Sequence, residues 1–264
     1  MPVQSQIADR LDRLEATQDV TVLYACESGS RAWGFASADS DYDVRVVYVH
    51  PRDWYLSVDL ERRDDTIDPP VENEIDLHGW DLRKALGLFR GANPTLREWL
   101  RSPVVYREDT AVMDRWRALV PDYYPPGAVA RAYRGLARSV AEQNLTGAPI
   151  SHKAYLYVLR ALLAVRWVEQ DRGPVPLSFE RLLDETVGDA AVRDAVETLL
   201  TQKRDGGELD DGPRRPVIHD FVETELERQR ALDVPSPASR AGGDEPLNAL
   251  FRAVLDRHAD SSVS

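Results

Sequence analysis

Cysteine is almost absent, since the 264 residues include only Cys26. A lone cysteine excludes an intramolecular disulfide framework and a zinc site built from cysteines. Long apolar runs are absent too, because none approaches the roughly 18 residues that a membrane-spanning helix needs. The N-terminal stretch carries charges every few residues and lacks the apolar core of a secretory signal. We therefore expect a cytoplasmic protein with no membrane partner.

Lysine is scarce, and acidic residues outnumber basic ones. There are 33 basic and 45 acidic residues, a formal net charge of −12, and the only lysines are Lys84, Lys153 and Lys203. This balance argues against a surface that coats nucleic acid broadly, because contacts to phosphates need a positively charged face. It is compatible with a local basic cleft. Adaptation to high salt and a GC-rich genome remain alternative explanations for the preference for arginine.

The chain nevertheless has the material for a folded core, with 43% hydrophobic and 30% charged residues. Apolar residues at helical spacing predict a helix over 5–17. Apolar, β-branched or alternating segments predict strands over 20–27, 41–49 and 72–78. The pattern becomes helical again from Asp81 onward, so the first half of the chain mixes strands and helices.

A proline-rich segment at 121–127 predicts a domain boundary. Beyond it, the sequence predicts almost only helices, over 127–146, 151–171, 178–187, 189–204, 217–232 and 246–258. We therefore predict an α+β protein with a catalytic domain over 1–120 and an all-helical C-terminal domain over 126–264.

Two aspartates in the second predicted strand indicate a metal site. Asp41 and Asp43 are two residues apart, so both carboxylates leave the same face of the strand. Two like charges this close raise each other's pKa unless a cation lies between them. Oxygen ligands of this kind suit Mg²⁺ or Mn²⁺, which bind protein carboxylates together with substrate phosphates.

A glycine and a serine follow the first predicted strand and indicate an anion site. A short helix beginning near Gly29-Ser30 would point backbone N–H groups at a phosphate. Gly29 allows close approach because it lacks a Cβ, and the Ser30 hydroxyl adds a donor. Arg31 follows directly, and the sequence leaves open whether it contacts a phosphate or forms a surface salt bridge.

A third carboxylate is expected for activating an attacking hydroxyl group. Asp76 lies on the acidic face of the third predicted strand, and Glu74 on the same face is the second choice. A phosphate at a helix N-terminus opposite a metal held by aspartates is the geometry of nucleotidyl or phosphoryl transfer.

These residues also resemble a known family. A Gly-Ser pair, a spacer of about ten residues, Asp-x-Asp and a later strand carboxylate resemble the DNA polymerase β-like nucleotidyltransferase superfamily. The sequence motifs are most similar to those of its bacterial and archaeal branch associated with RNA-repair ligases. The likeness covers roughly residues 20–170 and rests on the segments GSRAWG (29–34), DSDYD (39–43), DLHGWDLRKAL (76–86), NPTLREWL (93–100), SPVVY (102–106) and KAYLYVLR (153–160).

The resemblance implies a polymerase β-like domain with a mixed β-sheet, in which Asp41, Asp43 and Asp76 bind two metal ions. It also implies a metal-dependent nucleotidyltransferase that moves a nucleoside monophosphate from an NTP to a hydroxyl acceptor. The association with RNA repair suggests an RNA end as acceptor. A protein side chain or a small molecule is equally compatible with these residues, and a catalytically silent NTP-binding regulator is a third interpretation.

Several further residues have open roles. Lys153, Tyr157 and Arg160 share one predicted helix face, and we assign Lys153 to nucleotide binding because a lysine among so many arginines suggests a point contact to phosphate. Arg45 shares the face of the two aspartates, where it either holds triphosphate or neutralises the acidic cluster. His78 and Lys84 remain unassigned, as does the oligomeric state.

Overall fold

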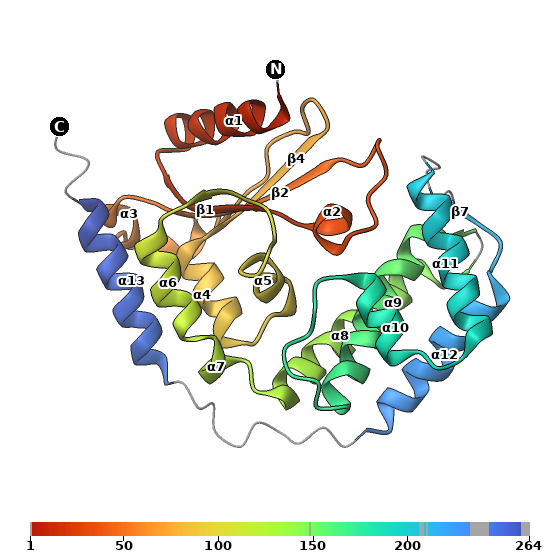
Figure 1. Ribbon diagram of the computed structural model, residues 1–264. Coiled ribbons are helices and arrows are strands. Elements are labelled where there is room, and N and C mark those ends of the chain that lie inside the picture. Colours follow the sequence, from red (N-terminus) through yellow and green to blue (C-terminus); the bar gives the residue numbers. More distant parts are fainter. Residues whose placement is uncertain (1, 148, 206–208, 210, 233–242, 260–264) are drawn as a thin grey trace. The chain divides into compact units, whose positions relative to one another are not determined.

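The computed structural model describes residues 2–147, 149–205, 209, 211–232 and 243–259 (Figure 1). It divides into two compact units. The first contains the described residues of 1–32, 41–123 and 240–264, and the second those of 33–40 and 124–239. No helix within the described ranges is both long and apolar enough to cross a membrane.

The first unit is built on a five-stranded sheet with the strand order β3-β4-β2-β1-β5. β2 and β4 pair in parallel, whereas the other pairs are antiparallel, so the sheet is mixed. This confirms the predicted fold class. The strands are β1 (Thr21–Glu27), β2 (Tyr42–Val49), β3 (Thr66–Ile67), β4 (Ile75–Asp81) and β5 (Val105–Glu108).

The helix α1 (Val3–Gln18) covers one face of this sheet. Its apolar residues Ile7, Leu11 and Leu14 recur at helical spacing and pack in one buried cluster with Val44, Tyr48 and other strand residues. Figure 1 shows α1 on one side of the sheet and α4 and α6 on the other. The remaining elements of the unit are α2 (Gly29–Trp33), α3 (Arg52–Tyr55), the 3-10 helix η1 (Leu60–Arg62), α4 (Leu82–Arg90), α5 (Pro94–Trp99), α6 (Thr110–Ala118), α7 (Val120–Tyr123) and α13 (Asp244–Ala259).

The third strand begins later than the sequence predicts. Asn73 and Glu74 have positive φ angles of 51° and 61°, and they form a turn in which the Glu72 and Ile75 backbones exchange hydrogen bonds. The prediction of a strand over 72–78 was therefore wrong at its start, because the polar–apolar alternation runs through the turn without a break. Glu74, the second choice for the third carboxylate, lies in this turn rather than on the strand.

The predicted domains, 1–120 and 126–264, differ from the observed units in two places. The C-terminal helix α13 belongs to the first unit, where it packs against α3, α4 and α6. Phe251 contacts the Tyr55 ring edge-on at 5.0 Å, and Arg257 forms an ion pair with Asp109 at 3.0 Å. The amphipathic pattern of α13 predicts that it packs against an apolar surface, but the pattern does not predict which unit provides that surface. The second difference, residues 33–40, is described with the site.

Within its described residues, the regular secondary structure of the second unit is helical apart from a short β6–β7 pair, in agreement with the prediction. Its centre is α9, which has twelve buried residues and packs against α8, α10 and α12. Ser151 and Ser178 cap the N-termini of α9 and α10 with their side chains, which satisfies backbone N–H groups there. The elements are α8 (Pro126–Asn144), β6 (Ile150–Ser151), α9 (His152–Glu169), α10 (Phe179–Thr186), α11 (Ala190–Arg204), β7 (Asp211–Gly212) and α12 (Pro216–Arg230).

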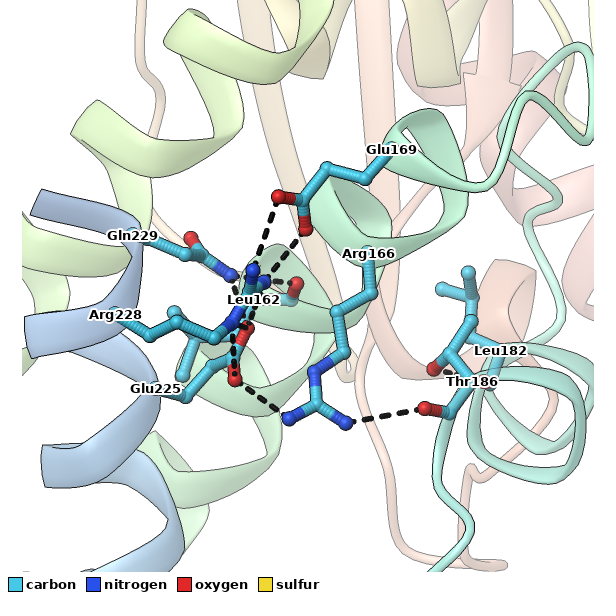
Figure 2. Close-up of polar contacts among 8 residues, drawn as sticks. All are labelled: Leu162, Arg166, Glu169, Leu182, Thr186, Glu225, Arg228 and Gln229. Carbon is cyan, nitrogen blue, oxygen red and sulfur yellow. Dashed lines mark hydrogen bonds and ion pairs between the residues drawn. The ribbon is translucent and has the colours of Figure 1, made fainter. Parts of the chain in front are cut away.

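A buried glutamate joins two of these helices. Glu225 on α12 is 1% exposed, and Arg166 from α9 and Arg228 each donate to it at 2.6 Å (Figure 2). Burial alone would raise the pKa of Glu225, but the hydrogen bonds from Arg166, Arg228 and Gln229 outweigh it and lower the pKa to about 2. The second unit is therefore held together by an ionised carboxylate as well as by apolar packing.

Candidate active site

Two strand carboxylates lie side by side on the sheet. The parallel register of β2 and β4 pairs Asp43 with Asp76 and Arg45 with His78. Because side chains alternate along a strand, these residues lie on the face opposite the one that carries Val44 and packs against α1. The side chains of Asp43 and Asp76 are 23% and 32% exposed. This face thus presents two partly exposed carboxylates on neighbouring strands.

A guanidinium group joins these carboxylates. Arg45 Nη2 donates to Asp43 Oδ1 at 2.7 Å and to Asp76 Oδ2 at 2.8 Å, and Nη1 donates to the Asp76 backbone oxygen at 2.9 Å. Two carboxylates this close would repel each other without an intervening cation. Of the two roles that the sequence leaves open for Arg45, the structure shows neutralisation of the acidic pair.

Asp41 occupies a different position. It precedes β2, its side chain is exposed, and its backbone oxygen accepts a hydrogen bond from Arg31 Nε at 3.2 Å. Among the residues that the structure describes, no group of three or more histidine, cysteine, aspartate or glutamate side chains is arranged to hold a metal ion. The structure therefore brings Asp43 and Asp76 together, while no third carboxylate from Asp41 joins them in a metal-ligand group among the described residues.

Gly29 lies against the Asp43 carboxylate. Its φ angle is +59°, and a Cβ built on it would be 2.0 Å from Asp43 Oδ2. The backbone N–H of Ser28 also donates to the Asp43 backbone oxygen at 2.9 Å. Only glycine fits here, because any other residue would strain the backbone and displace the carboxylate. The Gly-Ser turn and the Asp-x-Asp strand are thus one structural element.

Ser30 and Arg31 continue this turn on α2. Ser30 is buried, at 7% exposure. The Arg31 guanidinium lies over the Tyr42 ring, 3.9 Å from its centroid, and its Nε bonds the Asp41 backbone. Arg31 therefore ties α2 to the start of β2.

A buried glutamate at this site was not predicted from the sequence. Glu27 ends β1 at 1% exposure, and its Oε1 accepts a hydrogen bond from the Asp43 backbone N–H at 2.9 Å. The Tyr106 hydroxyl donates to its Oε2. Burial raises the pKa of Glu27, while these two hydrogen bonds oppose the shift. The sequence signal for Glu27 is a charged residue at the end of an apolar strand. Its role could not be predicted from the local sequence, because its partners lie on other strands.

The donor chemistry of this edge fits a hard divalent cation. Carboxylate oxygens are the ligands that Mg²⁺ and Mn²⁺ take, and the structure already places one positive charge between the two carboxylates. Arg45 binds Asp43 through Oδ1, whereas Oδ2 is the oxygen that faces Gly29. Asp43 and Asp76 are therefore the residues that would hold such a cation, which would supply positive charge beside a phosphate.

The predicted nucleotide-binding lysine lies in the other unit. Lys153 is exposed on α9. Arg160, predicted on the same helix face, is instead 2% exposed and donates to the Leu177 backbone oxygen at 2.9 Å. Its guanidinium also lies over the Trp33 ring at 4.7 Å. Lys153 and Arg160 thus do not form a common exposed basic face.

The segment between the Gly-Ser turn and Asp41 belongs to the second unit. Trp33 lies edge-on to Tyr157 at 5.0 Å, and Phe35 lies edge-on to Phe179 at 5.5 Å. Lys203 Nζ donates to the Ser37 hydroxyl at 3.3 Å. The helical unit therefore anchors the middle of the motif, which the predicted boundaries at 120 and 126 did not anticipate because the anchor residues are far apart in the sequence.

The other open residues have structural partners. His78 Nδ1 lies 3.3 Å from Asp68 Oδ1, and Lys84 forms an ion pair with Asp65 at 2.7 Å. These contacts assign neither His78 nor Lys84 to a ligand.

The sequence matches a family model over residues 3–253, nearly its whole length. That model describes the RNA repair pathway DNA polymerase β family. The chain belongs to this family, which confirms the resemblance and supports the classification as a nucleotidyltransferase of the polymerase β type associated with RNA repair.

Two individual proteins that are similar to this chain say less about its function than the family model does. The uncharacterised protein YcgL of Bacillus subtilis is 43% identical over 254 residues, covering 96% of this chain and 97% of that protein. A crystal structure of a nucleotidyltransferase-like protein from Exiguobacterium sibiricum aligns with 99% of this chain and 92% of its own, at 10% identity and a TM-score of 0.33. This structural likeness is too distant to carry an argument.

Proposed function

We propose that this protein transfers a nucleoside monophosphate from an NTP to a hydroxyl group at an RNA end, in a metal-dependent reaction. Membership in the RNA repair pathway family supports the class of reaction and the acceptor. The observation that carries the proposal is the pairing of Asp43 with Asp76, with Gly29 packed against one carboxylate oxygen. This arrangement supports the proposal that the pair binds a cation next to the turn to which we assign phosphate.

In this proposal, Asp41, Asp43 and Asp76 are the residues that would hold two Mg²⁺ or Mn²⁺ ions, which would supply positive charge to the phosphates and lower the pKa of the acceptor hydroxyl. Arg45 keeps Asp43 and Asp76 close together by binding one oxygen of each. Glu27 holds the Asp43 backbone in place. We assign the terminal phosphates to the Gly29-Ser30 turn, with Arg31 as a further phosphate contact. Lys153 stays assigned to nucleotide binding on the sequence pattern alone.

The bonds of the reaction balance without any co-reactant. The acceptor oxygen forms a bond to the α-phosphorus of the NTP, and the bond from that phosphorus to the β-phosphate oxygen breaks. Pyrophosphate leaves with the electron pair. The proton of the acceptor hydroxyl passes to Asp76 or to water, and Asp76 is the carboxylate we assign to this role.

The experiment that tests the proposal incubates the protein with each α-labelled NTP and Mg²⁺ or Mn²⁺, with separate RNA, DNA and protein acceptors. We expect label on RNA, and none when the metal is chelated. Label on DNA or on protein would identify a different acceptor for the same transfer reaction. NTP binding without transfer to any acceptor would favour the catalytically silent interpretation.

A further inference from the structure

A cavity lies in the first unit, away from the paired aspartates. It has a volume of about 570 Å³ and is lined by residues of α1, β2, α3, β3 and β4 and of the loops beside β3. Its lining includes Tyr48, which belongs to the α1-covered face of the sheet. The cavity is therefore on the opposite face from Asp43 and Asp76, and its volume is in the range of small-molecule sites.

The strongest sign of a ligand is a buried hydroxyl without a partner. Tyr48 is 0% exposed, and its hydroxyl makes no hydrogen bond with any described residue. Such a group costs stability unless something satisfies it. The ring packs closely against Gly79, since a Cβ built there would be 3.1 Å from two of its carbon atoms. Burial, followed by nearby aspartates, raises the pKa of Tyr48, so the hydroxyl stays protonated and can donate.

Flat rings line the same cavity. His50 stacks on Trp54 with centroids 4.0 Å apart and an interplanar angle of 12°. Tyr48 contacts His50 edge-on at 5.5 Å. Burial lowers the pKa of His50, which favours an uncharged ring at neutral pH. Stacked aromatic rings beside a lone donor are suited to a planar ligand with an acceptor on its edge.

Most arginine side chains that line the cavity already have hydrogen-bond or ion-pair partners in the protein. Arg10 is 7% exposed and donates to the Pro70 backbone oxygen at 2.8 Å. Arg13 pairs with Glu72 at 3.0 Å, and Arg63 donates to Asp59 at the same distance. These guanidinium groups are already engaged, so the cavity is poorly suited to a highly charged anion such as triphosphate.

The exposed carboxylate of Asp64 also lines the cavity and can accept a hydrogen bond. A ligand that contacts both this carboxylate and the Tyr48 hydroxyl needs a donor and an acceptor. Nucleobases have this combination on their edges, and their faces stack on aromatic side chains.

We propose that this cavity binds a nucleobase, on the face of the sheet opposite the paired aspartates. The base can come from a free nucleoside or from an RNA strand, since both present the same edge and ring. The inference does not depend on the transfer reaction, because none of its residues belongs to the proposed catalytic set.

The binding of adenosine, guanosine, cytidine and uridine is measured by calorimetry and by thermal unfolding. A chelator is present to remove divalent metal ions. A parallel arm uses a short oligoribonucleotide with no phosphate at its ends. We expect at least one nucleoside or the oligoribonucleotide to bind with one site per chain and to raise the unfolding temperature. Binding of the oligoribonucleotide alone identifies RNA as the source of the base.

Tyr48→Phe separates a ligand-binding hydroxyl from a structural one. We expect the variant to bind about two- to tenfold more weakly, the value of one hydrogen bond. Its ligand-free form should unfold at a higher temperature than the wild type, because an unsatisfied hydroxyl has been removed. Trp54→Ala should weaken the same binding through the lost ring.

The matched control is Tyr155→Phe in the second unit. The Tyr155 hydroxyl has a partner, the His219 ring at 2.9 Å, so this variant should unfold at a lower temperature and bind the base normally. Asp43→Asn should also bind it normally. Failure of every nucleoside and of the oligoribonucleotide to bind, or unchanged binding by Tyr48→Phe, would overturn the proposal without affecting the proposed function.

Discussion

Replacing Gly29 with alanine tests whether the Gly-Ser turn and the aspartate pair are one element. The new Cβ would be 2.0 Å from Asp43 Oδ2, and the backbone has a φ angle of +59°. Left-handed backbone costs a non-glycine residue about 1–2 kcal/mol, and forcing an atom into a packed site costs about 1–3 kcal/mol more. The sum is a loss of about 2–5 kcal/mol in the free energy of unfolding, together with a displaced carboxylate.

Gly34→Ala is the matched control. Gly34 has a φ angle of +87°, but a Cβ there meets nothing within 4 Å. This variant should therefore lose only about 1–2 kcal/mol, from backbone strain. Urea unfolding of the two variants, with label transfer measured in parallel, isolates the contact with Asp43. Equal stability losses, or a fully active Gly29→Ala protein, would refute the reasoning.

Three further perturbations test other parts of the account. Glu225→Gln should lower the free energy of unfolding by about 3 kcal/mol, since a carboxylate with a pKa of about 2 instead of 4.5 stabilises the fold above pH 4.5. In urea titrations, the stability of the wild type should therefore fall as the pH drops from 4.5 toward 2. The same dependence of stability on pH in the variant would contradict this. Arg45→Met should lower the stability of the metal-free protein by about 1–3 kcal/mol, and added Mg²⁺ or Mn²⁺ should recover more stability than in wild type; an identical response in thermal melts would argue against neutralisation by Arg45. Trp33→Ala should reduce kcat/KM for the NTP at least about tenfold by releasing the motif segment. The control is Phe221→Ala in the same unit, where the ring lies 4.9 Å from the Arg166 guanidinium and away from this segment; equal kinetics of the two variants would remove the anchoring role.

Much of the local structure was predictable because it depends on short-range patterns. The helices beyond residue 126 and the strands that contain Asp43 and Asp76 follow from the spacing of apolar residues. Alternation also predicts that one face of each strand carries its carboxylates. The family resemblance rests on motifs that are contiguous in the sequence, and it was confirmed.

The rest depends on long-range pairing. That Arg45 reaches Asp76 follows from the parallel register of β2 and β4, which no single segment specifies. Glu27 acquires its role through Asp43 and Tyr106, which lie on two other strands. An amphipathic pattern on α13 and an aromatic motif at 33–40 indicate burial, but burial against which unit is decided by tertiary packing.

The position of Arg45 determines how the substitution Asp43→Asn should affect the free energy of unfolding. Because the guanidinium already neutralises Asp43 and Asp76, Asp43→Asn removes an ion pair instead of relieving a repulsion. Circular dichroism at neutral pH should therefore show a folded protein with a slightly lower unfolding temperature. This measurement accompanies any activity comparison, so that lost activity is not confused with lost structure.

The central claim is that the Asp43–Asp76 pair is the catalytic centre of nucleotidyl transfer. Its most direct test compares the rate of label transfer from α-labelled NTP to RNA by wild type, Asp43→Asn and Asp76→Asn, with Asp39→Asn as an exposed control in the same motif. The account predicts that both variants of the pair are folded and inactive at saturating Mg²⁺ or Mn²⁺, while Asp39→Asn transfers label at the wild-type rate. Transfer by folded Asp43→Asn or Asp76→Asn at the wild-type rate would contradict it.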